Sequence, residues 1–303
     1  MSQAPLFPDP DEIARLVPKP GSVTWRAAGD ARIMAASAYA LTLQVAHPTI
    51  ASGVREHSNY KEDPWGRLLR TLDYVNLTVY GGAEAAAATG RNLRQMHKRI
   101  RGVAPDGTRY SALEPEAYAW VHATLADAIV VGHERFGNRL SDEDVKCLWR
   151  EWVDLGRVVG VREGDLPASW REYLEYRDRL ITDRLEPSEV VDGVLATLAT
   201  PMRPPIPVLN DPAWKALRLP IARAVRLATV GLTPLRLRDK LGMQWSRGQE
   251  LELRAIGAAS RASGPLLPQR LRCMGPCYLR WRREAIGHGE LAEAAPALAH
   301  AAA

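Results

Sequence analysis

Cysteine is scarce in this sequence of 303 residues, which contains only Cys147, Cys273 and Cys277. Cys273 and Cys277 form a C-x₃-C motif, but no second pair of cysteines is present to complete a zinc site. An odd number of cysteines also leaves at least one thiol unpaired within the chain. We interpret all three as reduced structural thiols.

Long apolar runs are also lacking. The best candidate, residues 33–50, is interrupted by Gln44, His47 and Pro48, which is typical of a buried helix and not of a membrane span. The N-terminal segment is proline-rich and carries acidic residues early, without the basic and apolar regions of a signal peptide. We therefore expect no integral membrane segment and a cytoplasmic location.

Charge of one sign is not concentrated anywhere. The chain has 40 basic and 35 acidic residues, a net charge of +5 that is spread along the sequence without a basic arm. This distribution does not predict a nucleic-acid partner. The apolar fraction of 46% and the charged fraction of 25% are those of a soluble globular protein, which excludes disorder throughout.

Alternating strand patterns are almost absent, whereas helical periodicity runs through most of the chain. A long helix is expected over residues 29–56, with a break at Pro48 because proline lacks the amide donor and clashes with the preceding turn. Further helices are expected over residues 64–80, 90–101, 114–136, 141–160, 167–184, 187–199, 211–229, 247–263 and 277–293.

The pattern predicts an all-α fold with a single multi-helix domain over residues 29–291, an N-terminal extension over 1–28 and an alanine-rich tail over 292–303. The H-E-x-x-H, Walker, G-x-S-x-G and paired Glu-x-x-His motifs are missing. Zincins, P-loop NTPases, α/β-hydrolases and di-iron bundles therefore lose their support from the sequence.

A polar stripe lies on the helix expected over residues 64–80. Its members follow helical spacing opposite a row of leucines and valines, and they are Arg67, Arg70, Thr71, Tyr74 and Thr78. The stripe is either the solvated face of an amphipathic helix or the wall of a pocket. In a pocket, the arginines would donate to an anion and the threonine hydroxyl would orient a ligand. Spacing alone does not decide between the two.

One histidine stands among basic residues in "NLRQMHKRIRG", residues 92–102. On a regular helix Leu93, Met96 and Ile100 share the side of His97, so the imidazole is expected to point toward the core. An inward histidine of this kind is either a hydrogen-bonded core residue or a ligand.

Several fragments resemble a known family when they are taken in order. They are "LTLQVAHPTIASGVREHSNYKEDPWGRLLRTLDYV", "VYGG", "NLRQMHKRIRG", "DGTRYSALEPEAYAWVHATL" and "LPASWREYLEY". Together they resemble the MpaB/rubber-oxygenase catalytic-domain family over about residues 28–180, and more loosely beyond. The resemblance implies an α-helical haem b protein with globin-like helical packing around a haem pocket. It matches His97 to the family's proximal iron ligand.

The same resemblance matches Arg67 and Thr71 to an arginine and threonine pair near the haem. Arg70 stands where the rubber-cleaving branch has a lysine that ligates iron on the distal side. Because arginine stays protonated and is a poor ligand, we expect an open or water-filled distal site. We add Arg94 and Arg101 as partners of the haem propionates, because guanidinium groups suit carboxylates.

Three further histidines occupy family-typical positions, namely His47, His57 and His122. Each has structural hydrogen bonding as the alternative to a role at the haem, and His47 is the candidate for the distal side. The catalytic glutamate of the rubber-cleaving branch is not placed, with Glu56 and Glu62 as candidates. Cleavage of polyisoprene is therefore not expected.

The leading hypothesis is a haem b-dependent oxygenase that uses O₂ to oxidise a small hydrophobic substrate, with oxidative cleavage as one form of that reaction. Arg67, Thr71, Arg70 and His47 are its candidate catalytic residues. One alternative is a noncatalytic haem protein that binds or senses a gas. Another is a haem-free helical binding module. The sequence does not determine the substrate or the oligomeric state.

Overall fold

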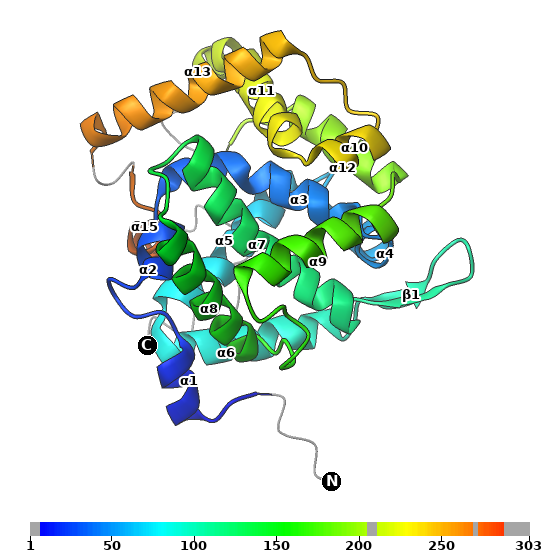
Figure 1. Ribbon diagram of the computed structural model, residues 1–303, viewed down its shortest axis with the longest axis vertical. Coiled ribbons are helices and arrows are strands. Elements are labelled where there is room, and N and C mark those ends of the chain that lie inside the picture. The colour runs from blue at the N-terminus through cyan, green and yellow to red at the C-terminus, as the bar shows by residue number, and fades with distance from the viewer. Residues whose placement is uncertain (1–6, 205–210, 269–271, 288–303) are drawn as a thin grey trace.

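The computed structural model describes residues 7–204, 211–268 and 272–287. Over these ranges the chain is built from helices and one small β-hairpin (Figure 1), which confirms the all-α prediction. In chain order the elements are α1 (Pro10–Leu16), α2 (Val23–Ala28), η1 (Ala31–Ala36), α3 (Ser37–Val45), α4 (Pro48–His57), α5 (Pro64–Tyr80), α6 (Gly82–His97), β1 (Arg101–Val103), β2 (Arg109–Ser111), α7 (Pro115–Arg135), α8 (Asp142–Val158), α9 (Trp170–Asp183), α10 (Glu189–Ala199), α11 (Asp211–Leu232), α12 (Leu235–Lys240), α13 (Arg247–Ser263), η2 (Gly264–Leu266) and α15 (Pro276–Gly287).

Local sequence explains where several helices begin. The Asp63 side chain accepts the Gly66 amide at 2.8 Å, and Pro64 occupies the first position of α5, where its missing N–H costs nothing. Ser141 accepts the Asp144 amide at 3.1 Å at the start of α8. Both starts agree with the sequence predictions.

Helix α7 lies at the centre of the fold and packs against η1, α3 and α8. The core around it contains the buried indoles of Trp120, Trp149 and Trp152. The Trp120 indole donates to the carbonyl of Leu43 at 3.0 Å, and that of Trp152 donates to the carbonyl of His122 at 2.9 Å. These bonds satisfy the polar atoms of large apolar side chains.

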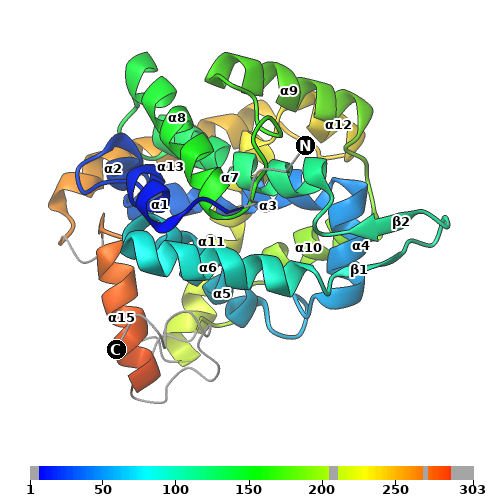
Figure 2. The same ribbon diagram turned by 90° about the horizontal axis from the view of Figure 1, so that it is seen from below.

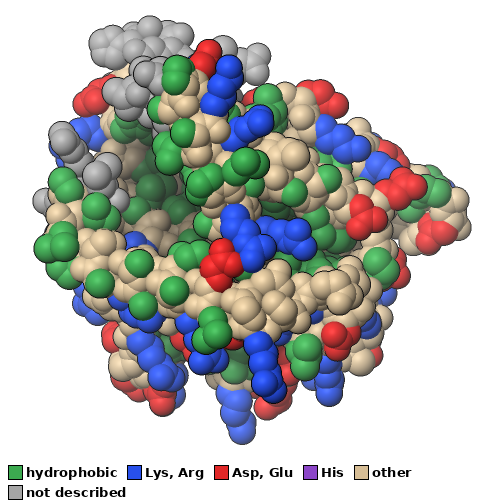
Figure 3. Space-filling model, turned by 90° about the horizontal axis from the view of Figure 1, so that it is seen from above, with side chains coloured by type: hydrophobic (Ala, Val, Ile, Leu, Met, Phe, Trp, Pro, Cys, Tyr) green, Lys and Arg blue, Asp and Glu red, His purple; other side chains and the backbone are tan. Residues whose placement is uncertain are grey.

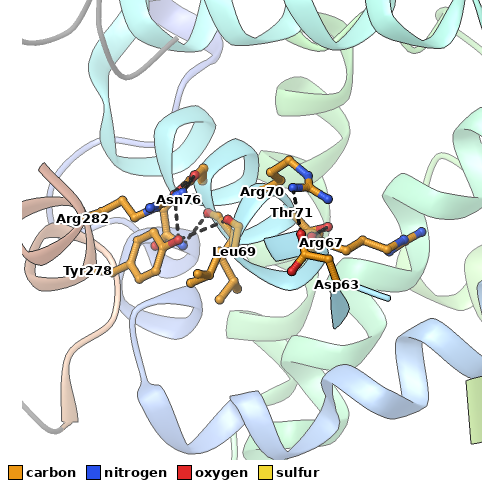
Figure 4. A network of polar contacts seen from close by, with 10 residues as sticks. Asp63, Arg67, Leu69, Arg70, Thr71, Asn76, Tyr278 and Arg282 are labelled. Carbon is orange, nitrogen blue, oxygen red and sulfur yellow. Dashed lines mark hydrogen bonds and ion pairs between the residues drawn. The ribbon is translucent and has the colours of Figure 1, made fainter. Parts of the chain in front are cut away.

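A buried carboxylate joins α5 to α15, the last helix of the described chain. Asp73 on α5 accepts two hydrogen bonds at 2.8 Å from Arg282 on α15 and one at 2.7 Å from the Tyr278 hydroxyl. Asn76 adds a bond from the Gly275 amide at 3.0 Å. Figure 4 shows this cluster on one side of α5. It fixes α15 against α5 across about 200 residues of sequence.

A second buried carboxylate joins three helices of the core. Asp127 on α7 is fully buried and accepts the hydroxyls of Tyr39 on α3 and Tyr173 on α9, each at 2.8 Å. Arg177 on α9 contributes an ion pair at 3.3 Å. A buried charge needs partners of this kind, because burial without them is costly.

The prediction of one helix over residues 29–56 is wrong in detail. The segment forms η1, α3 and α4, and the break at Pro48 is confirmed. Asp30 accepts the Arg32 amide at 3.0 Å, which starts the separate turn η1. His47 is extended and serves as the residue before α4, a conformation that proline imposes on its predecessor.

The histidine helix also differs from the prediction at both ends. It starts at Gly82 and not at Gly90, because the turn after α5 is confined to Gly81 and Gly82, the latter with φ at +81°. It ends at His97, and residues 101–111 form a hairpin in which Gly102 pairs with Tyr110. Helices α5 and α6 lie side by side, and the hairpin projects from the body beyond the end of α6 (Figure 2).

Helices α1 and α2, which fall in the expected N-terminal extension, pack on this body. Helix α1 contacts α6 and α8, and α2 contacts α8. The alanine-rich tail expected over residues 292–303 lies outside the described residues, as does the end of the helix expected over 277–293. Within the described part of the chain, no helix has both the length and the apolar character that crossing a bilayer requires.

Candidate functional site

His97 is the last residue of α6, and its ring is held from two sides. Nδ1 lies 2.8 Å from the carbonyl oxygen of Leu93, one helical turn earlier, so the Nδ1–H donates to that carbonyl. The ring meets the edge of Tyr118 on α7 at a centroid distance of 5.6 Å. The Tyr118 hydroxyl donates to the carbonyl of Val159 at 2.8 Å, which fixes the tyrosine.

These contacts determine the chemical form of the imidazole. With Nδ1 carrying the hydrogen, Nε2 carries the lone pair, and among the described residues it has no hydrogen-bond partner. Burial lowers the pKa of His97, the hydrogen bond to Leu93 opposes this, and the positive charge of Arg94 lowers it further. The ring is therefore neutral near pH 7, as a metal ligand must be.

The neighbours of His97 depart from the expected inward face. Leu93 and His97 are half-buried, but Met96 is 41% exposed, because α6 ends there and leaves its outer side uncovered. Arg94 donates to the carbonyl of Gly160 at 3.4 Å in the turn after α8. Arg101 lies exposed on β1. The structure therefore does not bring Arg94 and Arg101 together.

The N-terminal half of α5 gathers a second polar group, which points away from the Asp73 cluster (Figure 4). Arg70 contacts the Asp63 carboxylate at 3.4 Å and Asn59 at 3.2 Å. Thr71 is exposed, and its hydroxyl donates to the carbonyl of Arg67 at 3.0 Å. The predicted trio Arg67, Arg70 and Thr71 is thus one contiguous group.

Arg67 is half-buried and has no carboxylate partner among the described residues. Its Nε donates to the Ser58 hydroxyl at 2.7 Å. Burial lowers the pKa of Arg67, and the neighbouring charge of Arg70 lowers it further. A half-buried guanidinium without a counter-charge favours an anion at this place.

The structure places His47 away from that group. It is fully buried, and its Nε2 lies 3.3 Å from Glu116 on α7, whose carboxylate also accepts from Arg184 at 3.0 Å. Burial lowers the pKa of His47, while Glu116 raises it. Nδ1 of His47 is buried without a protein partner.

His57 and His122 lie in two further hydrogen-bond groups. His57 is exposed at the end of α4, where its Nε2 is 3.2 Å from the Tyr110 hydroxyl, which also donates to Glu56. His122 is buried, bonds the carbonyl of Trp152 at 2.8 Å through Nε2 and stacks on that indole at 5.3 Å. These contacts of His57 and His122 are structural hydrogen bonds, which the sequence analysis gave as the alternative to a role at the haem.

Tyr118 is a residue that the sequence analysis missed. It lies four residues before His122 on α7, and nothing in its local pattern indicates that it meets His97 from another helix. The contact between α6 and α7, which the β-hairpin separates along the chain, brings the rings together.

His97 does not line either of two cavities. One of about 150 Å³ is lined by residues that include Arg157 and Leu166, and one of about 370 Å³ is lined by residues that include Arg238 and Trp245. No group of three or more metal-binding side chains is present in the described ranges. The haem pocket and the globin-like packing therefore stay predictions.

The lowered pKa of His122 predicts that the stability of the protein depends on pH. Burial lowers it from 6.5 to about 4, against the opposing hydrogen bond to Trp152. Between these values the unfolded chain binds more protons than the folded one, so stability is complete above pH 6.5 and falls as the pH decreases toward 4. We expect this residue to contribute a slope of about 1.4 kcal/mol per pH unit in the free energy of unfolding.

Urea unfolding of the wild type and of His122→Gln at pH 6.5 and pH 5 measures this contribution. The wild type should lose about 2 kcal/mol more than the variant between the two values. Other histidines titrate equally in both proteins and cancel in the comparison. Equal losses in the two proteins would contradict the assignment.

Over the described ranges, the fold and the site define a mainly helical protein with a neutral imidazole whose Nε2 has no hydrogen-bond partner and an arginine group without full counter-charge. The family model described as "ER-bound oxygenase mpaB/B'/Rubber oxygenase, catalytic domain" matches residues 25–262. The chain belongs to this family of oxygenase catalytic domains. The resemblance found in the sequence is thereby confirmed.

Two mycobacterial proteins are similar to this chain. They are "Uncharacterized protein Mb2261" of Mycobacterium bovis and "Uncharacterized protein Rv2237" of Mycobacterium tuberculosis. Each is 25% identical over 232 residues, which cover 75% of this chain and 87% of the relative. No solved structure matches the chain.

Proposed function

We propose that this protein is a haem b-dependent oxygenase that oxidises a small hydrophobic substrate with O₂, and that His97 is the residue that would bind the haem iron. The observation that carries the proposal is the state of the His97 ring. Its Nδ1–H is committed to the Leu93 carbonyl at 2.8 Å, which leaves the Nε2 lone pair available. A ligating histidine is commonly oriented in this way, with its other nitrogen donating to a backbone carbonyl.

Bound haem would supply the iron chemistry that activates O₂. The protein's own residues would hold the haem and orient its ligand. Tyr118 restricts rotation of the His97 ring from α7, and burial keeps that ring neutral. Arg94, which reaches the turn after α8 from the same helical turn as His97, is our candidate to hold a propionate.

Arg67, Arg70 and Thr71 on α5 would lie on the side of the haem where O₂ and substrate react. Arg67 carries a positive charge that no described carboxylate neutralises, and such a donor stabilises negative charge that develops in a reaction. The Thr71 hydroxyl is exposed and keeps an acceptor lone pair free after donating to Arg67. Arg70 is restrained by Asp63 and cannot replace a metal ligand, because a guanidinium group has hydrogen-bond donors and no lone pair to offer a metal.

An absorption spectrum of the protein purified from haem-supplied cells tests the cofactor. We expect an intense Soret band with about one haem per chain. Oxygen consumption is then measured with terpenoid, lipid and aromatic substrates. If no Soret band appears after haem reconstitution, the protein is a haem-free binding module. If haem is bound but no substrate raises oxygen consumption, the protein is a noncatalytic gas-binding protein.

A further inference from the structure

The N-terminal half of α11 has an exposed surface unlike that of the other helices of the core. Every residue from Lys215 to Ile221 is exposed, including Leu217 at 46%, Leu219 at 69% and Ile221 at 38%. The C-terminal half, by contrast, is buried over residues 227–230. Seven consecutive exposed residues span about two helical turns, so this half of the helix projects from the body.

The projecting half begins where α11 leaves α13. Arg223 on α11 pairs with Glu252 on α13 at 2.6 Å, and the Gly231 backbone passes close to the Leu253 side chain. Residues before Arg223 therefore extend beyond the contact between the two helices. Seen from above, hydrophobic and basic side chains gather over this end of the molecule beside a hollow (Figure 3).

Beyond Asp211 in its first turn, which pairs with Arg203, helix α11 carries only positive charge. No acidic residue occurs between Asp211 and Asp239, while four basic residues lie on α11 itself. Arg223 is neutralised by Glu252. Lys215, Arg218 and Arg226 are exposed and form no ion pair with the described residues.

We propose that the N-terminal half of α11 docks on an anionic lipid surface. Exposed leucine and isoleucine side chains interleaved with unpaired cations are the pattern of a helix that lies in a membrane interface, where both kinds of residue find partners. Large apolar side chains that gather on a surface mark such interaction sites.

The charges argue against the simplest protein partner, a second copy of the chain. A symmetric dimer through this face would place Lys215 and Arg218 against the same cations of the other copy. A lipid surface with negative headgroups instead attracts both residues and accepts Leu217 and Ile221, which lie one helical turn apart on the same side of α11, among the acyl chains. The inference is independent of haem, since no residue of the proposed haem site takes part.

Vesicle co-sedimentation of the full-length protein tests the inference. Vesicles of phosphatidylcholine alone are compared with vesicles that contain phosphatidylglycerol, at low and at physiological salt. The wild type should sediment with the anionic vesicles, and high salt should weaken this binding. The variant Leu217→Ser/Arg218→Glu should lower the partition coefficient roughly thirtyfold, because its charge changes by two units.

A matched control changes the same kinds of residue on the β-hairpin. Val103 is 57% exposed and Arg109 is exposed, so Val103→Ser/Arg109→Glu preserves the fold and alters the charge equally. This variant should bind as the wild type does. Absence of wild-type binding to anionic vesicles, or an equal loss in both variants, would overturn the proposal. So would a dimer in sedimentation velocity that only the α11 variant dissociates.

Discussion

Replacement of His97 by alanine is expected to abolish stoichiometric haem binding and the Soret band. The substitution removes the Nε2 lone pair that the Leu93 bond leaves free, and neither of the two cavities is lined by a histidine that could take its place. The haem content after purification should fall by more than roughly tenfold, since even the loss of groups that only orient a ligand costs that much. Pyridine haemochrome absorbance per chain measures it.

Chemical rescue separates a ligand from a structural residue. The variant His97→Gly should regain a Soret band when imidazole is added, because the free base can enter the vacated space and restore the bond. His133→Gln is the matched control, since both nitrogens of His133 lie within 3.0 Å of backbone carbonyls and neither is free to bind metal. Full haem content and an unchanged spectrum in His97→Ala would refute the assignment.

Asp127→Ala should be the most destabilising substitution in the core. The fully buried carboxylate accepts from Tyr39, Tyr173 and Arg177, and its removal leaves two buried hydroxyls without an acceptor and a half-buried arginine with only the exposed Asp178. Burial raises the pKa of both tyrosines well above 10, so neither hydroxyl can ionise to relieve the loss. We expect the free energy of unfolding to fall by about 3–5 kcal/mol in urea titrations.

Asp178 supplies the control for this prediction. It contacts the same arginine, Arg177, at 3.7 Å, but its side chain is 62% exposed. Asp178→Ala should change stability by less than about 0.5 kcal/mol, because exposed ion pairs contribute little. If Asp127→Ala and Asp178→Ala lose similar free energies of unfolding, the burial of Asp127 is not the cause of the destabilisation.

Helix positions were predictable wherever the signal was local. Proline at the first position and a capping aspartate predicted the start of α5 at Pro64, and the structure begins and ends that helix as expected, at Tyr80. The sequence offered no such signal for η1, whose start depends on Asp30 folding back on Arg32. The same limit applies to α6, where an alanine-rich run before Gly90 gave no periodic pattern to extend the helix to Gly82.

The candidate site was predictable only as a set of residues. Spacing on one helix places Arg67, Arg70 and Thr71 together, and the structure agrees because neighbours on a helix stay neighbours. The partners of His47 and His122 come from α7 and α8, up to 69 residues away, and no local pattern reports them. Histidine spacing therefore could not separate a core histidine from a ligand.

The all-α class, most helix boundaries and the family follow from the residues in their order, because periodicity, caps and motif spacing are properties of neighbours along the chain. Three features were decided only when helices packed: the Tyr118–Val159 bond that holds the tyrosine against His97, the missing counter-charge of Arg67 and the burial of Asp127. Each depends on which distant backbone or side-chain group lies within hydrogen-bond reach, and that distance exists only in the folded molecule.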